Sequence, residues 1–99
     1  MKHVILLFLF VLGVSVFAQN SGQELYQVKK YKEAGEAFKQ ALQQTPNEYK
    51  LQLGYANSLN KQDFYEKAVQ QYNIAEELNN NDAELYFSRG VALVFLKLY

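Results

Sequence analysis

The sequence predicts an all-α fold in which antiparallel helix–turn–helix units repeat and stack as an α-solenoid, with about five helices after an N-terminal hydrophobic segment. Two observations lead to this prediction. Beyond Gln19 the chain is rich in Ala, Leu, Gln, Glu and Lys, which favour helices, and it contains one proline. In addition, the spacing of small and aromatic residues in residues 31–46 returns 34 positions later in residues 65–80. A repeat of this length cannot bury its own apolar face, so neighbouring repeats must cover it.

Residues 1–18 have the pattern of a secretory signal peptide. The segment begins with a lysine and a histidine after Met1, continues with fourteen uncharged and mostly apolar residues (4–17), and offers small side chains for cleavage near Ala18. The apolar run is shorter than the roughly 20 residues that a membrane-spanning helix needs, so an uncleaved anchor is the weaker alternative. We therefore expect an exported protein, periplasmic or secreted, in which residues 19–99 form one helical domain with no stable membrane span.

The expected helices are bounded by capping patterns and by the single proline. Three pairs have the spacing of a capping box or come close to it, and each precedes an apolar-periodic run: Ser21 with Glu24, Asp63 with Glu66, and Asn81 with Glu84. Pro46 fits the first turn of a further helix, where its missing N–H is not needed. The expected helices are 21–29, 32–44, 47–60, 64–78 and 82–98, in repeat units of about 19–46, 47–80 and an incomplete 81–99.

Small and aromatic side chains form one stripe on the second and fourth expected helices. The stripe consists of Ala34, Phe38, Ala41 and Leu42 in one helix and of Ala68, Tyr72, Ala75 and Leu78 in the other. Small residues let two helices approach closely, and each aromatic side chain fills the space between them. The third helix is expected to meet this stripe with one side, made of Leu51, Tyr55, Ala56 and Leu59.

Identical residues recur at the 34-residue offset, among them Tyr31 and Tyr65, Ala34 and Ala68, Ala41 and Ala75, and Leu51 and Leu85. With Gly22 and Leu25 before the first stripe and Pro46 after it, this pattern resembles the tetratricopeptide repeat (TPR). The resemblance covers nearly all of residues 19–99. It implies a right-handed stack of helix pairs whose first helices line a concave groove that binds a peptide or a protein surface.

On the geometry that the resemblance implies, the groove side of the third and fifth helices carries the candidate partner-binding residues. These are Lys50, Leu53, Asn57, Asn60, Lys61, Glu84, Phe87 and Val91, with Val94 beside them. Asparagines suit a peptide backbone, Leu53 and Phe87 suit its side chains, and lysines suit carboxylates. The alternative is an ordinary solvated helix face. Family members that clamp a C-terminal carboxylate use basic and Asn side chains. This chain places Gln19, Gln23, Gly54, Glu84 and Ser88 at those positions, which argues against such a clamp.

Composition argues against catalysis, metal binding and nucleic-acid binding. Ten basic and ten acidic residues give a formal net charge of zero, without the basic excess of a nucleic-acid-binding protein. The chain has no cysteine, and cleavage near Ala18 removes its only histidine. The run at residues 79–82 lacks the alternating acidic ligands of an EF-hand. We therefore expect a non-catalytic protein with no catalytic residues, no metal and no cofactor.

The last nine residues, 91–99, are apolar almost all round, whereas a terminal repeat normally shows water a polar face. We expect Val94, Phe95 and Leu98 to remain uncovered. Either the chain is the front part of a longer repeat array, which the recurrence of Tyr31 and Tyr65 at Tyr99 favours, or this helix pairs with another chain. The leading functional hypothesis is an exported interaction module or scaffold that uses its groove. The alternative is an assembly protein that oligomerises through its last helix.

Overall fold

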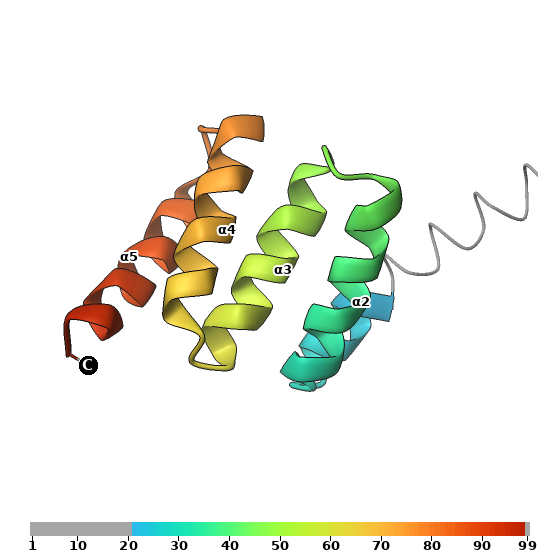
Figure 1. The fold of residues 1–99 in the computed structure, drawn as a ribbon, viewed down its shortest axis with the longest axis horizontal. Coiled ribbons are helices and arrows are strands. Elements are labelled where there is room, and N and C mark those ends of the chain that lie inside the picture. The colour runs from blue at the N-terminus through green and yellow to red at the C-terminus, as the bar shows by residue number, and fades with distance from the viewer. Residues whose placement is uncertain (1–20, 99) are drawn as a thin grey trace, which may run out of the picture.

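The computed structural model describes residues 21–98, whose regular structure is helical throughout (Figure 1). Residues 21–27 form a short helical segment, and four longer helices follow: α2 (Tyr31–Gln44), α3 (Tyr49–Lys61), α4 (Tyr65–Leu78) and α5 (Ala83–Leu98). The predicted all-α fold is confirmed, and the five predicted helices are present with ends shifted by no more than two residues. The predicted signal peptide and its cleavage point near Ala18 lie outside the described residues.

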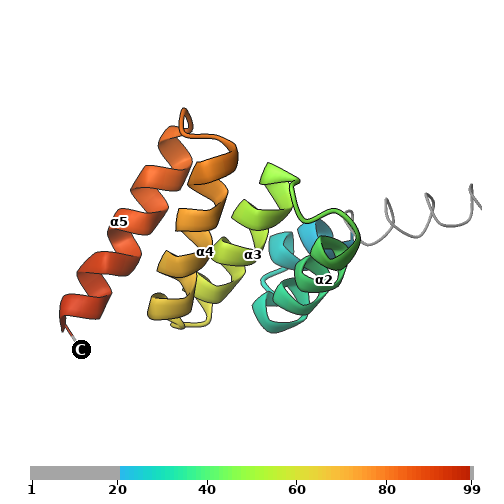
Figure 2. The same ribbon diagram turned by 45° about the horizontal axis from the view of Figure 1, so that its top comes forward.

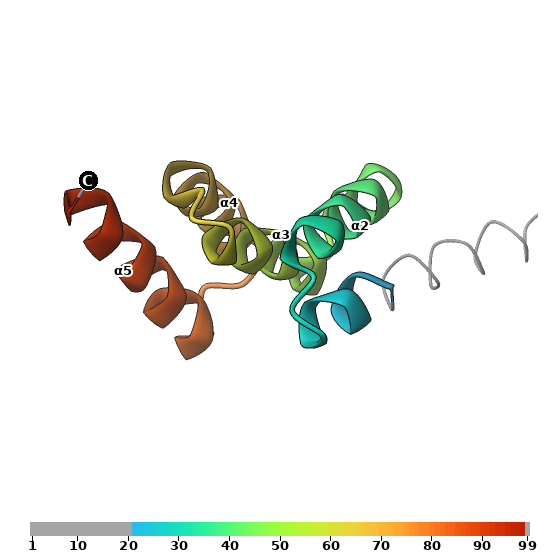
Figure 3. The same ribbon diagram turned by 90° about the horizontal axis from the view of Figure 1, so that it is seen from below.

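The helices stack in chain order. α2, α3, α4 and α5 follow one another across the molecule (Figures 1 and 2), with short connections that make neighbours antiparallel. Seen from below, α3 lies between α2 and α4, and α5 lies beyond α4 (Figure 3). α3 also contacts α5 directly, so it is the helix with the most neighbours.

The turns after residues 21–27 and after α3 have the same geometry, 34 residues apart. In the first turn the N–H of Lys30 donates to the carbonyl of Leu25, and in the second the N–H of Phe64 donates to that of Leu59. Lys29 and Asp63 occupy the left-handed region in these turns, both with φ of 66°. This is the Schellman arrangement that ends a helix. The prediction that Asp63 caps the start of α4 is therefore wrong, because Asp63 closes the preceding turn.

Two other predicted helix starts also need correction. Pro46 lies in the turn between α2 and α3, and α3 begins three residues later at Tyr49. The proline still prevents α2 from continuing, because Thr45 is the last residue whose N–H bonds back into that helix. At the start of α5 the cap is Asp82, whose Oδ1 accepts from the N–H of Glu84 at 3.1 Å, and not Asn81.

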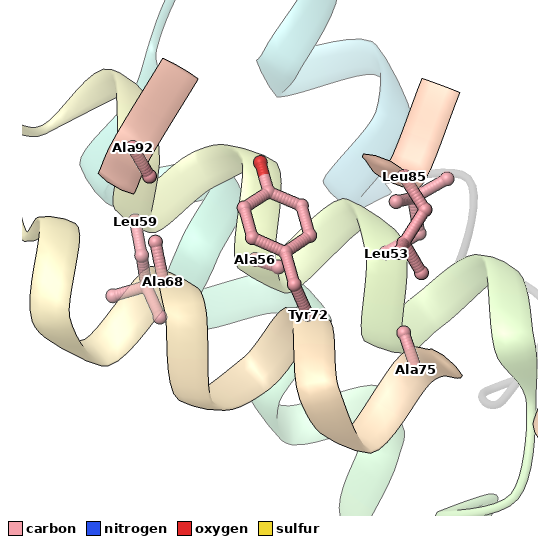
Figure 4. Close-up of a cluster of buried hydrophobic side chains, with 8 residues drawn as sticks. All are labelled: Leu53, Ala56, Leu59, Ala68, Tyr72, Ala75, Leu85 and Ala92. Atoms are coloured by element: carbon pink, nitrogen blue, oxygen red, sulfur yellow. The ribbon is translucent and has the colours of Figure 1, made fainter. Parts of the chain in front are cut away.

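Buried side chains form two clusters on opposite sides of α3. One joins α3 to α2 through Ala34, Phe38, Ala41 and Leu51, and the other joins α3 to α4 and α5 through Leu53, Ala56, Leu59, Ala68, Tyr72, Ala75, Leu85 and Ala92 (Figure 4). The predicted small–aromatic–small stripe is thus confirmed as core. The expectation that α3 uses a single side is wrong, since Leu51 faces α2 while Ala56 and Leu59 face α4. Leu78, expected in the stripe, is 38% exposed.

Polar and aromatic contacts hold α5 against α4. The guanidinium of Arg89 forms a bidentate ion pair with the carboxylate of Glu76, with N···O distances of 3.1 and 3.3 Å. It also donates to Oδ1 of Asn73. Hydrogen bonding from Arg89 lowers the pKa of the Glu76 carboxyl. Further along α5, the ring of Phe95 stacks on Tyr65 with centroids 5.1 Å apart. The expectation that Phe95 is uncovered is therefore wrong, whereas Val94 and Leu98 are 58% and 69% exposed.

Candidate partner-binding groove

A cavity of about 510 Å³ opens between the helical segment 21–27, the first half of α3 and the start of α5. Its walls mix apolar, amide and charged side chains, as a site for a peptide requires. The lining residues are Gln23, Tyr26, Phe38, Glu48, Tyr49, Lys50, Leu51, Leu53, Gly54, Asn57, Asp82 and Glu84. We call this cavity the groove.

One hydrogen bond joins the two sides of the groove. The hydroxyl of Tyr49, in the first turn of α3, donates to Oδ2 of Asp82 at 2.6 Å, while Oδ1 of Asp82 caps α5. One carboxylate therefore fixes the start of α5 against the start of α3. Burial, together with the hydrogen bond to Asp82 and the nearby charge of Glu84, raises the pKa of Tyr49 above its ordinary value. The protonated Tyr49 hydroxyl is the donor of this bond between the start of α3 and Asp82.

Phe38 forms a wall of the groove because two glycines face its ring. A Cβ placed on Gly22 would lie 2.9 Å from the Phe38 ring, and one placed on Gly54 would lie 2.6 Å from it. Real Cβ atoms do not approach other atoms so closely, so the ring occupies space that only glycine leaves free. The Phe38 ring therefore lies between Gly22 of the segment 21–27 and Gly54 of α3.

Asn57 and Asn60 bond to neighbouring helices. The buried hydroxyl of Tyr72 on α4 donates to Oδ1 of Asn57 at 2.5 Å, and Nδ2 of Asn60 donates to the carbonyl of Ser88 on α5 at 3.4 Å. Burial raises the pKa of Tyr72 to about 12. Both asparagines therefore help to set the positions of α4 and α5. Asn57 also lines the groove and is half-buried, so part of this side chain remains accessible from the groove.

The sequence-predicted binding residues fall into two groups. Lys50, Leu53, Asn57 and Glu84 line the groove together. Asn60, Lys61, Phe87 and Val91 are not among the lining residues. Leu53 is only 8% exposed and belongs to the core, while Phe87 is 75% exposed. A binding role for any of the eight stays a prediction.

Sequence reasoning did not identify several lining residues, among them Tyr26, Glu48, Tyr49 and Asp82. Glu48 and Asp82 lie just before a helix and Tyr49 is the first residue of α3, positions at which a pattern based on helix faces gives no signal. Gln23 could have been found, because it stands 34 positions before Asn57 and so has the same place in its repeat.

The charges around the groove are mainly negative. Glu48, Asp82 and Glu84 contribute carboxylates, and Lys50 is the one cation among the lining residues. Burial raises the pKa of Tyr26, and the nearby charge of Glu84 adds to this increase. The negative charge of Glu84 would also repel a ligand that bears a carboxylate. This agrees with the sequence argument against a carboxylate clamp. The groove therefore favours a ligand with positive charge.

Other kinds of site are not supported by the described part of the chain. Among residues 21–98, no group of three or more His, Cys, Asp or Glu side chains is placed to hold a metal ion. Within the same residues, no helix combines the length and the apolar character needed to cross a bilayer. Neither finding concerns residues 1–20.

Comparison with known proteins agrees with the fold. Residues 56–94, which run from the middle of α3 to near the end of α5, match the family model of the TPR repeat. No curated protein matches the chain. The resemblance noted from the sequence is thus confirmed by the family match and by the packing of adjacent helices. TPR repeats typically mediate contacts between proteins, and the family is generally non-catalytic.

Proposed function

We propose that the chain is a non-catalytic protein–protein interaction module that holds an extended segment of a partner in its groove, as its match to the TPR repeat supports. The observation that supports this most is a cavity lined by residues from four helices: the segment 21–27, α2, α3 and α5. Hydrogen-bonding side chains from α3 and from the segment 21–27 lie beside the apolar surface of Phe38 and Leu53. Such a combination suits the alternating backbone and side-chain groups of a peptide.

The charge of the groove narrows the class of partner. Glu48 and Glu84 are exposed, whereas Asp82 is already engaged by Tyr49 and by the start of α5. A partner segment with a lysine or arginine can pair with Glu84 at one side of the groove, while its backbone bonds to Asn57 and Gln23. We therefore propose a basic, extended segment as the ligand. In this proposal Asn57 still binds the peptide backbone and Leu53 still contacts its apolar side chains. The main charge contact is assigned to Glu84, and the lysines are secondary.

Selection from a random peptide library tests this proposal and needs no candidate partner at the outset. We expect enriched sequences to contain Lys or Arg, and a synthetic peptide made from one of them to bind with measurable affinity. Reversing one charge of a pair that is close and partly desolvated weakens binding by about tenfold. Glu84→Lys should show this loss by calorimetry. Glu77→Lys makes the same change on the exposed side of α4 and should leave the affinity unchanged.

Two outcomes would count against the groove: enrichment of acidic peptides, and an equal loss of binding with both charge reversals. The first would overturn the assigned charge preference, and the second would show that binding follows overall charge and not the groove. Asn57→Ala gives a further check, because it should weaken the peptide contact even at high salt, where the pairing of Glu84 is screened.

We also propose that the protein is exported, as the composition of residues 1–18 supports. Cleavage near Ala18 would release it to the periplasm or the exterior, and retention of the segment would anchor it instead. The N-terminal sequence of the protein isolated from its native cells distinguishes these cases. A chain that begins near Gln19 agrees with cleavage, and one that retains the hydrophobic segment agrees with anchoring.

The alternative function, assembly through the last helix, receives support from Val94 and Leu98, which are exposed, but not from Phe95, which stacks on Tyr65.

A further inference from the structure

The turn after the helical segment 21–27 carries exposed lysines next to an exposed apolar side chain. Lys29, Lys30 and Lys32 are all exposed, and Val28, which precedes them, is 64% exposed. A lysine side chain has an apolar stem and a charged end, so it can lie against an apolar surface while its charge stays in water. The turn therefore presents apolar surface and positive charge to solvent at the same place.

The turn after α3 lies beside this first turn. Nε2 of Gln62 donates to the carbonyl of Tyr31 at 3.4 Å, and Nζ of Lys61 lies 6.0 Å from the centroid of the Tyr31 ring. The second turn adds another exposed apolar side chain, Phe64, which is 50% exposed. Nζ of Lys67 lies 5.8 Å from the centroid of the Phe64 ring. The two turns therefore form one surface with the same combination of side chains.

Charge separates this surface from the opposite end of the molecule. We define the basic end as residues 28–33 and 61–67, which contain five lysines and three acidic residues. Equal lengths of chain at the other end, residues 45–50 and 78–84, contain one lysine and three acidic residues. Figure 1 shows the turns of the first set at one end of the helices and the turns of the second set at the other. The carboxylates of the groove all belong to the second set, so the groove opens near the acidic end.

From this distribution we propose that the basic end binds anionic phospholipid headgroups at the surface of a membrane. A lysine close to an anionic lipid surface strengthens binding about fivefold. Val28 and Phe64, both exposed, can enter the boundary between the headgroups and the acyl chains while the lysines pair with phosphates. In this orientation the acidic end faces away from the anionic surface, and the groove stays accessible to a partner. The lipid-binding surface is distinct from the groove.

The apolar run at residues 4–17 supports a membrane as the partner of this surface. Ten residues separate this run from Val28, a span of at most about 40 Å even in a fully extended chain. An apolar anchor and a basic patch on one chain act together, because each keeps the other at high local concentration near the bilayer. A patch of modest net charge is therefore sufficient when the run is retained. Cleavage near Ala18 leaves the basic end intact.

A polarity-sensitive dye on the full-length protein, incorporated into vesicles, tests the proposal. The chain has no cysteine, so one introduced cysteine places the dye at a single chosen position. Gln27→Cys puts it beside Val28, and Asn47→Cys puts it at the acidic end; both replaced side chains are exposed. We expect a larger blue shift of the dye at position 27 in vesicles that mix phosphatidylglycerol with phosphatidylcholine than in vesicles of phosphatidylcholine alone. The dye at position 47 should give the same spectrum in both.

Variants of the labelled protein then locate the contact. Lys32→Glu should lower the ratio of bound to free basic ends by at least about tenfold, because it replaces an attraction to the lipid with a repulsion. Lys39→Glu makes the same change at an exposed residue further along α2 and should leave the ratio unchanged within about twofold, because salt screens a more distant charge. Val28→Ser should also reduce the shift, whereas Ile74→Ser, at an exposed apolar residue of α4, should not. Circular dichroism confirms that each variant is folded.

Three outcomes would overturn the proposal. The first is an equal spectrum at position 27 in neutral and anionic vesicles, which would show that the basic end does not recognise lipid charge. The second is an equal effect of Lys32→Glu and Lys39→Glu, which would show that only the overall charge matters. The third is a response to soluble polyglutamate but not to anionic lipid, which would make an acidic protein the partner of this surface. Because the groove residues are unchanged in every variant, none of these results bears on the proposed groove function.

Discussion

α3 and α5 show how one sequence pattern leads to two different surfaces. Leu51 and Leu85 correspond in the repeat, and both are buried against the preceding helix. Ser58 and Ala92 likewise correspond, and both are fully buried. On the opposite side the helices diverge. Leu53 and Leu59 of α3 are buried there, whereas the corresponding Phe87 and Leu93 are 75% and 45% exposed on what we call the outer face of α5. Burial on one side is thus set by the preceding helix, and burial on the other depends entirely on the following helix.

Within residues 21–98, α3 is the helix on which the other helices pack. It takes part in both buried clusters, lines the groove, and accepts or donates hydrogen bonds to α4 and α5. α5 is held by one apolar face, by the Arg89–Glu76 ion pair and by the stacking of Phe95 on Tyr65. We therefore expect substitutions around α3 to cost far more stability than matched substitutions on the outer face of α5.

The largest expected effect is that of Tyr72→Ala, which empties the space between α3 and α4. Truncation of a fully buried aromatic residue costs about 3–5 kcal/mol in the free energy of unfolding. Phe87→Ala removes a similar ring from the outer face of α5 and should cost less than about 0.5 kcal/mol. Urea denaturation followed by circular dichroism measures both. If Tyr72→Ala does not fold, Tyr72→Phe still tests the site through loss of the hydrogen bond to Asn57, at about 1 kcal/mol.

An intermediate effect, of opposite sign on the two helices, is expected for glycine to alanine substitutions. Gly54→Ala gains helix propensity of about 1 kcal/mol but forces a methyl group against a Phe38 ring already held by Gly22, at a cost of about 1–3 kcal/mol. Gly90→Ala meets no neighbour and should raise the free energy of unfolding by about 0.5–1 kcal/mol. Thermal melts give both signs directly. Stabilisation by both substitutions would contradict the close packing of Phe38 on α3.

The smallest effect concerns pH and the bond between the starts of α3 and α5. The pKa of Tyr49 is higher in the folded chain than its ordinary value of 10.0, so the protonated hydroxyl stabilises the fold fully below pH 10. This contribution falls as the pH rises above 10 toward the raised pKa. Tyr49→Phe should therefore cost about 0.5 kcal/mol at pH 7, because the bond is only part-buried, and should show a shallower loss of stability above pH 10. Equal slopes for the two proteins in alkaline urea titrations would argue against the Tyr49–Asp82 bond.

The sequence predicted the helices and the core stripe well because both depend on local pattern. Ala34, Phe38 and Ala41, like their counterparts in α4, follow the helical period, and this fixes which side of each helix turns inward. The recurrence at 34 residues then indicated which helices are equivalent. Four of the eight predicted binding residues line the groove: Lys50, Leu53 and Asn57 lie on α3, and Glu84 lies in the first turn of α5.

What the sequence did not reveal depends on contacts between distant residues or on turn geometry. Lys29 adopts a left-handed conformation that its residue type does not favour, and the Schellman bonds of the turn impose it. Phe95 belongs to the same apolar run as Val94, yet only the packing of α5 against Tyr65 covers one and leaves the other bare. Asp82 lines the groove and accepts a hydrogen bond from Tyr49, a residue 33 positions earlier in the sequence.

The helical fold, the 34-residue repeat and the inward side of each helix follow from the sequence, because the short-range spacing of apolar and small residues decides these features. Contacts between helices determine that α3 is buried on two sides, and that three carboxylates and a single lysine lie around one groove. These properties follow from which helix lies next to which, and equivalent residues become buried or exposed according to that neighbour.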